Sequence, residues 1–231
     1  MVAPQPADAA DPEALAAAAR LAAIQARLPQ RCRLLAVSKG QPAGAIRALA
    51  AAGQRSFAES RLQEATAKQQ ELADLPGLDW HFIGRLQANK ARPVLQRFGT
   101  IHSLYSLALA ERLARIAAEE GLAPVVFAQV KLRPDPGKGG FEPEALRRLW
   151  PQLRQLAPLR LEGLMTIPPL GLAAAERAAL FAEAAALAAE LGAAELSMGM
   201  SGDWPEAAAA GSTWVRIGSA LFGPRATAAP L

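Results

Sequence analysis

Apolar runs alternate with helical patterns along most of the chain. Where apolar residues recur three and four positions apart we expect helices; residues 106–120 are the clearest case, and Gly121 is placed to end that helix. Asp203 and Glu206 predict a capping box at the start of a later helix. The apolar runs between the helical patterns predict strands at residues 34–38, 56–59, 80–83, 100–104, 125–130, 161–167, 195–200 and 214–218. Strands that alternate with helices in this way predict one α/β domain, a (β/α)8 barrel of the TIM type, with a doubly wound open sheet as the alternative.

The two ends of the chain depart from this alternation. Residues 1–10 are rich in Pro and Ala, which predicts a disordered tail, and residues 226–231 are expected to form a second short tail. Asp11-Pro12 predicts the start of an extra N-terminal helix, with Asp as N-cap and Pro at the first helical position. This helix is expected to continue to about Leu28, because the proline that follows stops it. The barrel domain, including this helix, is therefore expected to span residues 11–225.

Composition excludes several classes of protein. The chain has 231 residues with one Cys and two His, so Cys32 cannot form an internal disulfide, and His81 and His102 lack the spacing of metal ligands. The first residues do not resemble a secretory signal, and no uninterrupted apolar stretch reaches about 18 residues, so we expect a cytoplasmic protein without a membrane partner. The formal net charge is +4, but the basic residues are spread along the sequence, which argues against a nucleic-acid partner.

The ends of the predicted strands are where a barrel of this type places its reactive groups. Lys39 directly follows the first apolar run. Burial at a strand end would lower the pKa of its amine and favour a Schiff base with an aldehyde; a surface lysine with a buried aliphatic stem is the alternative. Ser201-Gly202 follows the seventh strand and Gly218-Ser219 the eighth, two positions that commonly offer hydroxyl and backbone N–H groups to a phosphate.

Three further side chains on the predicted strands each have two interpretations. Arg216 shares a strand face with Gly218, which places it either in the mouth of the barrel or in a buried ion pair with a carboxylate. Met165 either lines a pocket or fills the core. His81 stands between bulky residues, so we expect a hydrogen-bonded core histidine rather than a catalytic one.

Five segments, taken in order, resemble a known family. They are Val37-Ser38-Lys39, Trp80-His81-Phe82-Ile83-Gly84 with Leu86-Gln87 and Asn89-Lys90, Leu164-Met165-Thr166-Ile167-Pro168, Leu196-Ser197-Met198-Gly199-Met200-Ser201, and Val215-Arg216-Ile217-Gly218-Ser219. Together they closely resemble the pyridoxal 5'-phosphate (PLP) homeostasis protein family, relatives of the N-terminal barrel of alanine racemase. The resemblance extends over about residues 12–224.

The resemblance implies a barrel that binds PLP as a Schiff base on Lys39. It implies that the phosphate lies around Ser201, Gly218 and Ser219 and that Arg216 faces the pyridine nitrogen. We expect two further cofactor contacts, Met165 and Ser197. Such a protein would hold and deliver PLP, with PLP-dependent apoenzymes as partners and with neither catalytic nor metal-binding residues. We expect it to be a monomer.

Two departures from the family pattern concern the fine contacts with the cofactor. Ala58 and Ser60 stand where family members usually have Gly and Asn. In the loop after the fifth strand, Lys131 replaces the usual Asn, and Lys138-Gly139-Gly140 replaces Lys-Ser-Gly. Neither departure removes the lysine expected to form the Schiff base.

A weak PLP-dependent amino-acid racemase is the alternative function. Racemisation needs proton transfer on both faces of the bound substrate, and alanine racemases supply the second base as a Tyr from an added domain. We expect this chain to lack that domain, and its single Tyr, Tyr105, is not expected to act on the cofactor. A guanidinium beside the pyridine nitrogen cannot accept the ring proton, which weakens the ring as an electron sink, although this feature is compatible with racemase chemistry.

Overall fold

The computed structural model describes residues 12–135 and 137–223, and within them eight parallel strands close into a barrel. Each strand pairs with the next one along the sequence, and β1 also pairs with β8, where Leu35 lies opposite Arg216. The strands are β1 (Arg33–Val37), β2 (Ser56–Glu59), β3 (Asp79–Phe82), β4 (Thr100–Leu104), β5 (Val125–Gln129), β6 (Arg160–Met165), β7 (Glu195–Met200) and β8 (Trp214–Ile217). The closed order confirms the (β/α)8 prediction and excludes the open sheet.

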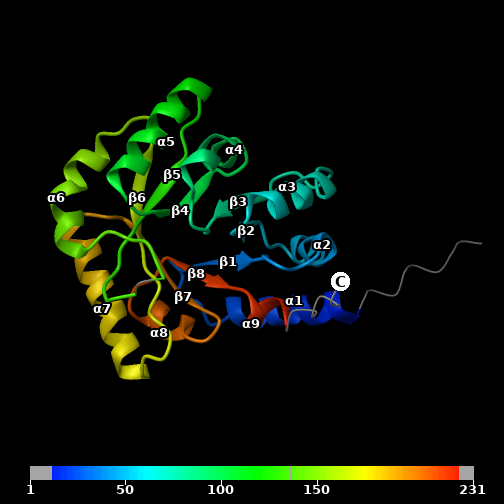
Figure 1. Cartoon of the computed structure of the whole chain (residues 1–231). Coiled ribbons are helices and arrows are strands. Elements are labelled where there is room, and N and C mark those ends of the chain that lie inside the picture. Colours follow the sequence, from blue (N-terminus) through cyan, green and yellow to red (C-terminus); the bar gives the residue numbers. More distant parts are fainter. Residues whose placement is uncertain (1–11, 136, 224–231) are drawn as a thin grey trace, which may run out of the picture.

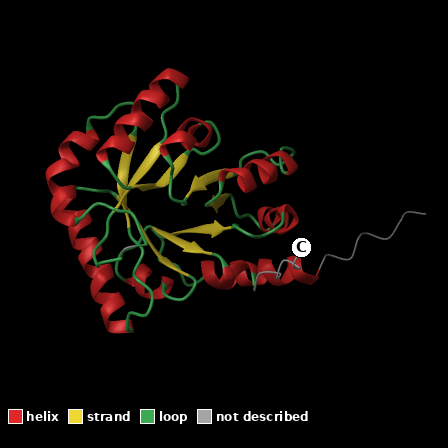
Figure 2. Ribbon diagram, in the orientation of Figure 1, coloured by secondary structure: helices red, strands yellow, loops and turns green. Residues whose placement is uncertain are grey.

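Helices follow the strands and lie outside the barrel (Figure 2). In α5 the residues Leu109, Leu113 and Ile116 are buried toward the strands, while Ser106 and Gly121 cap the two ends, which confirms the helix predicted at residues 106–120. The helices are α1 (Pro12–Gln25), α2 (Ala43–Ala51), α3 (Leu62–Glu71), a short 3-10 turn η1 (Ala88–Lys90), α4 (Ala91–Leu95), α5 (Leu107–Glu120), α6 (Pro143–Arg154), α7 (Ala174–Leu191), α8 (Trp204–Ala209) and α9 (Ser219–Phe222).

The extra N-terminal helix, α1, lies beside the last element of the fold, α9 (Figure 1). Its buried residues join one apolar cluster with those of α2 and α9, and Arg20 Nε donates to the carbonyl of Leu221 over 2.6 Å. The helix ends at Gln25, earlier than the predicted Leu28. The N–H groups of Arg27 and Leu28 bond to carbonyls three residues back, which tightens the chain ahead of the following proline.

The predicted domain of residues 11–225 extends slightly beyond the described residues at both ends. The expected N-cap, Asp11, and the tails expected at residues 1–10 and 226–231 lie outside them. These limits therefore stay a prediction.

Five strands end one or two residues before the predicted position, among them β1 at Val37, β3 at Phe82 and β8 at Ile217. β6 ends at Met165, and β5 ends at Gln129, after which Val130 forms an isolated bridge with Phe141. The N–H of Phe141 donates to the carbonyl of Gln129 over 2.8 Å, and the N–H of Lys131 donates back to the carbonyl of Phe141 over 2.9 Å. The long loop predicted after the fifth strand is thus closed against the end of β5.

The capping box predicted at the start of α8 does not form. Asp203 precedes the helix, but its Oδ1 accepts the backbone N–H of Met200 over 2.6 Å instead of a helical N–H. The carboxylate of Glu206 is bonded to the guanidinium of Arg177 on α7, 3.0 Å away. The prediction was wrong because tertiary partners, a strand end and a neighbouring cation, engage both carboxylates.

The inside of the barrel combines apolar and polar side chains. Inward-facing residues of five strands form a buried apolar cluster that includes Leu35, Val37, Phe127, Met165 and Trp214. The polar side chains buried in the barrel include His81 on β3, His102 on β4, Ser197 on β7 and Arg216 on β8. Buried polar groups need hydrogen-bond partners, so the contacts of these four residues define the interior of the barrel.

Candidate functional site

A cavity of about 320 Å³ lies at the carboxyl ends of the strands. It combines an amine, a guanidinium and hydroxyl groups with apolar walls. The residues that line it are Val37, Lys39, Gln41, Ile83, Met165, Ile167, Met200, Ser201, Gly202, Arg216, Gly218 and Ser219. Six of the seven predicted cofactor-binding residues are therefore brought together here, and Ser197 is the exception.

Lys39 is half-buried just after β1, and its two neighbours in the chain are held by α3. Lys68 Nζ donates to the carbonyl of Ser38 over 2.7 Å, and the N–H of Gly40 donates to the carboxylate of Glu64. Gly40 has a φ of 73°, in the left-handed region that favours glycine, and turns the chain away from the strand. The backbone is therefore fixed on both sides of the lysine that lines the cavity.

Lys68, Glu59 and Glu64 form a buried ion network that the sequence did not reveal. Lys68 Nζ lies 2.7 Å from Glu59 Oε1 and 2.6 Å from Glu64 Oε1. Burial raises the pKa of Glu59, against the opposing effect of its bond with Lys68. Burial would also raise the pKa of Glu64, but its bonds with Lys68 and a backbone N–H lower it overall. The available signal was the four-residue spacing of Glu64 and Lys68, which suits an ion pair on a helix.

Arg216 extends from β8 to the floor of the cavity. Its Nη1 donates to the carbonyl and the hydroxyl of Ser197, each over 2.8 Å, and its Nη2 donates to the carbonyl of Thr166 over 2.9 Å. Burial lowers the pKa of the guanidinium to about 10, which leaves it cationic at neutral pH. This position of Arg216 agrees with its predicted location in the mouth of the barrel. The alternative of an ion pair is wrong, because in the described structure Arg216 is bonded to neutral oxygens of Ser197 and Thr166.

Ser201 joins the ends of β7 and β8. Its Oγ accepts the backbone N–H of Gly218 over 3.2 Å and that of Ala220 over 3.3 Å. Ser219 follows at the start of α9 and lines the same cavity. The two segments predicted to bind a phosphate therefore lie side by side at one edge of the cavity.

Met165 and Ser197 occupy different positions relative to the cavity. Met165 is buried in the apolar cluster inside the barrel and also lines the cavity, so both of its interpretations apply. Ser197 is not among the lining residues; it is fully buried, and its hydroxyl contacts Arg216 and His102. The sequence motif could not show that Met165 lines the cavity and Ser197 does not. Ser197 contacts the side chain of Arg216, which itself lines the cavity, and this contact exists only in the folded protein.

The residues that depart from the family pattern lie outside this cavity. Lys131 is paired with Glu142 at 2.9 Å, and Lys138 donates to the carbonyl of Pro168 over 3.1 Å. Ser60 is likewise not a lining residue. The expectation that these departures alter cofactor contacts therefore stays a prediction.

The described residues contain neither a candidate metal centre nor a membrane-spanning helix. Across residues 12–135 and 137–223, no three His, Cys, Asp or Glu side chains are grouped to hold a metal ion. No helix in this part of the chain is both long and apolar enough to cross a membrane. Burial raises the pKa of the Cys32 thiol to about 11, which keeps it protonated and unreactive.

Comparison with known protein sequences relates the chain to proteins named for PLP. Residues 13–226 match the model of the alanine racemase N-terminal domain family. The pyridoxal phosphate homeostasis protein of Synechocystis sp. is 49% identical over 208 residues, which cover 87% of this chain and 95% of that protein. The protein of the same name from Escherichia coli K12 is 40% identical over 210 residues, which cover 86% of this chain and 88% of that protein.

Comparison with solved structures agrees with the sequence relationships. PipY of Synechococcus elongatus, solved with PLP bound, is 55% identical with a TM-score of 0.86, and the match covers 90% of this chain and all of that chain. An alanine racemase of Clostridium difficile matches with a TM-score of 0.71 at 19% identity, over 89% of this chain and 56% of that chain, which shows the shared fold. The family model and the relatives cover most of the length of the chain. The chain therefore belongs to the pyridoxal phosphate homeostasis protein family, and its barrel is of the type found in the N-terminal domain of alanine racemase.

Proposed function

We propose that this protein binds PLP on Lys39 and serves as a cytoplasmic reservoir and donor of the cofactor. The observation that carries the proposal is the place of Lys39 in the cavity, beside Arg216 and Ser201. Further support comes from PipY, a 55% identical protein solved with PLP bound, and from relatives named for PLP homeostasis.

The lining of the cavity fits the functional groups of PLP. The amine of Lys39 is the group that forms a Schiff base with an aldehyde. The hydroxyls of Ser201 and Ser219 offer donors to a phosphate. Apolar walls, including Met165, suit an aromatic ring.

We assign Arg216 to the pyridine nitrogen of the cofactor. A guanidinium has donors and no acceptor, so it can donate to this nitrogen but cannot accept the ring proton. PLP in an enzyme supplies an electron sink that is strongest when the ring nitrogen is protonated. A guanidinium beside the pyridine nitrogen leaves this nitrogen unprotonated and the electron sink weak, which favours storage of the cofactor over efficient catalysis.

The surroundings of Tyr105 also favour a carrier over a racemase. A racemase needs a second proton-transfer group opposite the lysine. The hydroxyl of Tyr105 donates to the carbonyl of Leu86 over 2.8 Å, and Tyr105 is not among the residues that line the cavity. Its proton is therefore engaged by the backbone away from the proposed site.

Borohydride reduction of the PLP-loaded protein, followed by peptide mapping, tests the proposal. We expect one pyridoxyl group on Lys39, and the Lys39→Ala variant should lose both this adduct and the visible absorption band of the loaded protein. Lys90→Ala is the matched control, because Lys90 does not line the cavity. Absence of an adduct on Lys39 would refute the proposal.

The role as donor and the state of association are tested separately. Mixing the loaded protein with a PLP-dependent apoenzyme should restore that enzyme's activity while the visible band of the donor decreases. Formation of D-amino acids that depends on Lys39 would instead support the weak racemase. We propose that the protein is a monomer, and a sedimentation mass of twice the 24.2 kDa chain would contradict this.

A further inference from the structure

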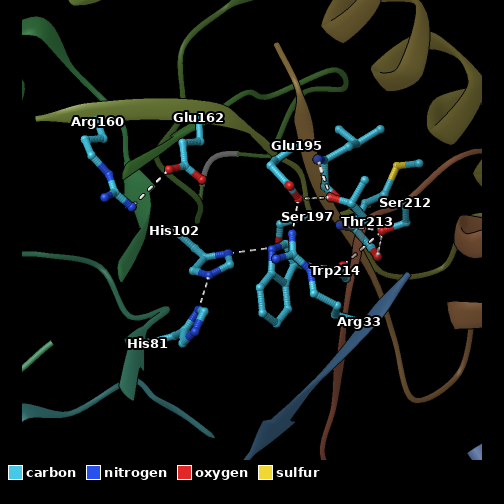
Figure 3. A network of polar contacts seen from close by, with 12 residues as sticks. Arg33, His81, His102, Arg160, Glu162, Glu195, Ser197, Ser212, Thr213 and Trp214 are labelled. Carbon is cyan, nitrogen blue, oxygen red and sulfur yellow. Dashed lines mark hydrogen bonds and ion pairs between the residues drawn. The ribbon is translucent and has the colours of Figure 1, made fainter. Parts of the chain in front are cut away.

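A chain of hydrogen bonds crosses the inside of the barrel, and Figure 3 shows its middle part, from His81 through His102 to Ser197. At the amino-terminal mouth, Asp79 Oδ2 lies 2.6 Å from His81 Nε2, and His81 Nδ1 lies 2.9 Å from His102 Nε2. His102 Nδ1 lies 2.9 Å from Ser197 Oγ, which is 2.8 Å from Arg216 Nη1. We call these five residues the interior relay. It links the amino-terminal mouth to the PLP cavity, which Arg216 lines.

The two ends of the interior relay determine where its protons lie. The guanidinium of Arg216 is a donor without an acceptor, and the ionised carboxylate of Asp79 is an acceptor without a donor. With both imidazoles neutral, Ser197 accepts from Arg216 and donates to His102 Nδ1. His102 Nε2–H then donates to His81 Nδ1, and His81 Nε2–H donates to Asp79. This order satisfies every group of the relay.

Protonation of His81 is incompatible with that order. A protonated imidazole donates from both nitrogens, so His81 Nδ1 could no longer accept from His102. His102 would then have to accept at Nε2 and donate from Nδ1 to Ser197. The hydroxyl proton of Ser197 would lose its acceptor in the relay, and a second cation would stand inside the barrel with Arg216.

The surroundings favour the neutral order. Burial holds the pKa of His102 well below its usual value, and the positive charges that His81 and Arg216 can bear lower it further. Burial alone would raise the pKa of Asp79, but its bond with His81 lowers it overall and keeps the carboxylate ionised. The other charged groups at this mouth come from three strands; they are Arg33 on β1, Arg160 and Glu162 on β6, and Glu195 on β7.

The amino-terminal mouth gives solvent access to one end of the relay. A second cavity of about 320 Å³ lies there and is lined by residues that include Asp79 and His81. The Asp79 side chain is 49% exposed, whereas His81 and His102 are buried. A proton from solvent can therefore reach His81 beside Asp79 without passing through the PLP cavity.

We propose that Asp79, His81, His102 and Ser197 are positioning residues for Arg216, and that proton uptake by His81 reverses the interior relay and weakens PLP binding at the opposite mouth. The coupling to PLP rests on the proposed function, whereas the proton order is a property of the protein alone. The expected loss of PLP affinity on reversal is about fivefold, the equivalent of one hydrogen bond.

Nitrogen NMR of the PLP-free protein tests the proton order directly, because the chain has two His residues. At pH 7.5 we expect both rings to be neutral, with the proton of each ring fully on Nε2. We also expect a coupling through the hydrogen bond between His102 Nε2 and His81 Nδ1. A proton on Nδ1 of either ring, or the absence of this coupling, would overturn the proposal.

The coupling to the PLP cavity is tested by PLP affinity between pH 5.5 and 8 in three proteins. In Asp79→Asn the loss of the carboxylate disfavours a cation at His81, so the fall in affinity should move to lower pH relative to the parent. Glu162→Gln is the matched control, because it removes a carboxylate at the same mouth that is bonded to Arg160 and not to His81.

Three outcomes of this titration contradict the coupling. One is an unchanged profile in Asp79→Asn, and another is an equal shift in Glu162→Gln. The third is absence of PLP binding in the parent protein, which would overturn the proposed function together with the coupling. The NMR result distinguishes this third case, because the proton order of the PLP-free protein does not depend on the ligand.

Discussion

Two buried cations flank the cavity, and their surroundings differ. On the side of β1 and β2, Lys68 is bonded to two carboxylates, those of Glu59 and Glu64, and does not line the cavity. On the side of β7 and β8, Arg216 does line the cavity and is bonded to neutral oxygens of Ser197 and Thr166. The first cation is neutralised by its neighbours, and the second keeps its charge facing the cavity.

These different surroundings suit the two buried cations to different roles, one in supporting the backbone and one in contacting a ligand. A cation that is paired with carboxylates is suited to fixing a backbone, and Lys68 does this for the segment of Lys39 through the carbonyl of Ser38. A cation without a bonded carboxylate is suited to a ligand, because its field is not cancelled at the site. This contrast makes Lys68 a support for the site and Arg216 a contact for the cofactor.

The largest expected effect comes from removing the neutralised cation. Lys68→Met would leave the fully buried Glu59 without its positive partner, and breaking a buried pair in this way costs about 3–5 kcal/mol of the free energy of unfolding. Urea unfolding measures this loss. Because Glu59 would bind a proton more tightly in the folded than in the unfolded state, the loss should shrink as pH falls below its folded pKa.

The double variant Lys68→Met/Glu59→Gln is the control for this loss. Removing both charges leaves no ion at the fully buried position of Glu59, while Glu64 is partly exposed and keeps its bond with the N–H of Gly40, so most of the stability should return. If the double variant were as unstable as the single one, the loss would come from packing rather than from charge.

A smaller effect on stability is expected from removing the cation in the cavity. Arg216→Met removes the donor to the carbonyl of Thr166, which costs about 1–3 kcal/mol. The carbonyl of Ser197 keeps the N–H of Thr166, and no buried carboxylate loses its cation. PLP affinity should fall more steeply than in Arg177→Met, a control outside the cavity whose partner is Glu206. Calorimetric unfolding and PLP titration of both variants measure the two effects. Equal PLP affinities would contradict the assignment of Arg216.

The smallest effect concerns the pH dependence of stability on the side of Arg216. The folded pKa of His102 lies well below its unfolded value, so below about pH 6.5 the unfolded chain binds more protons than the folded one. Stability should therefore fall as pH decreases from 6.5 toward the folded pKa, with at most about 1.4 kcal/mol per pH unit from this group. His102→Gln should flatten this slope in urea unfolding between pH 5.5 and 7.5. Identical slopes would show that His102 does not remain neutral.

Much of the site could be predicted because barrel topology ties function to strand ends. Lys39, Ser201 and Ser219 follow apolar runs, and in a (β/α)8 barrel the ends of all the strands meet at one mouth. Local signals sufficed for these positions. They did not suffice for the capping box at Asp203, because the end of β7 and Arg177 engage its two carboxylates. They also missed the end of α1 at Gln25, where bonds to carbonyls three residues back tighten the chain.

The sequence by itself determined the barrel, its strand order and the residues that meet at its carboxyl-terminal mouth, because hydrophobic periodicity and strand succession are properties of the chain read in order. The tertiary structure decided which buried charges are neutralised and which face the cavity. It brought Lys68 to the carbonyl of Ser38, next to Lys39. It also bonded the hydroxyl of Ser197 to Arg216, outside the lining of the cavity. These pairings join residues from different strands and helices, and their energies depend on burial and on distances of a few ångströms, which exist only once the barrel has closed.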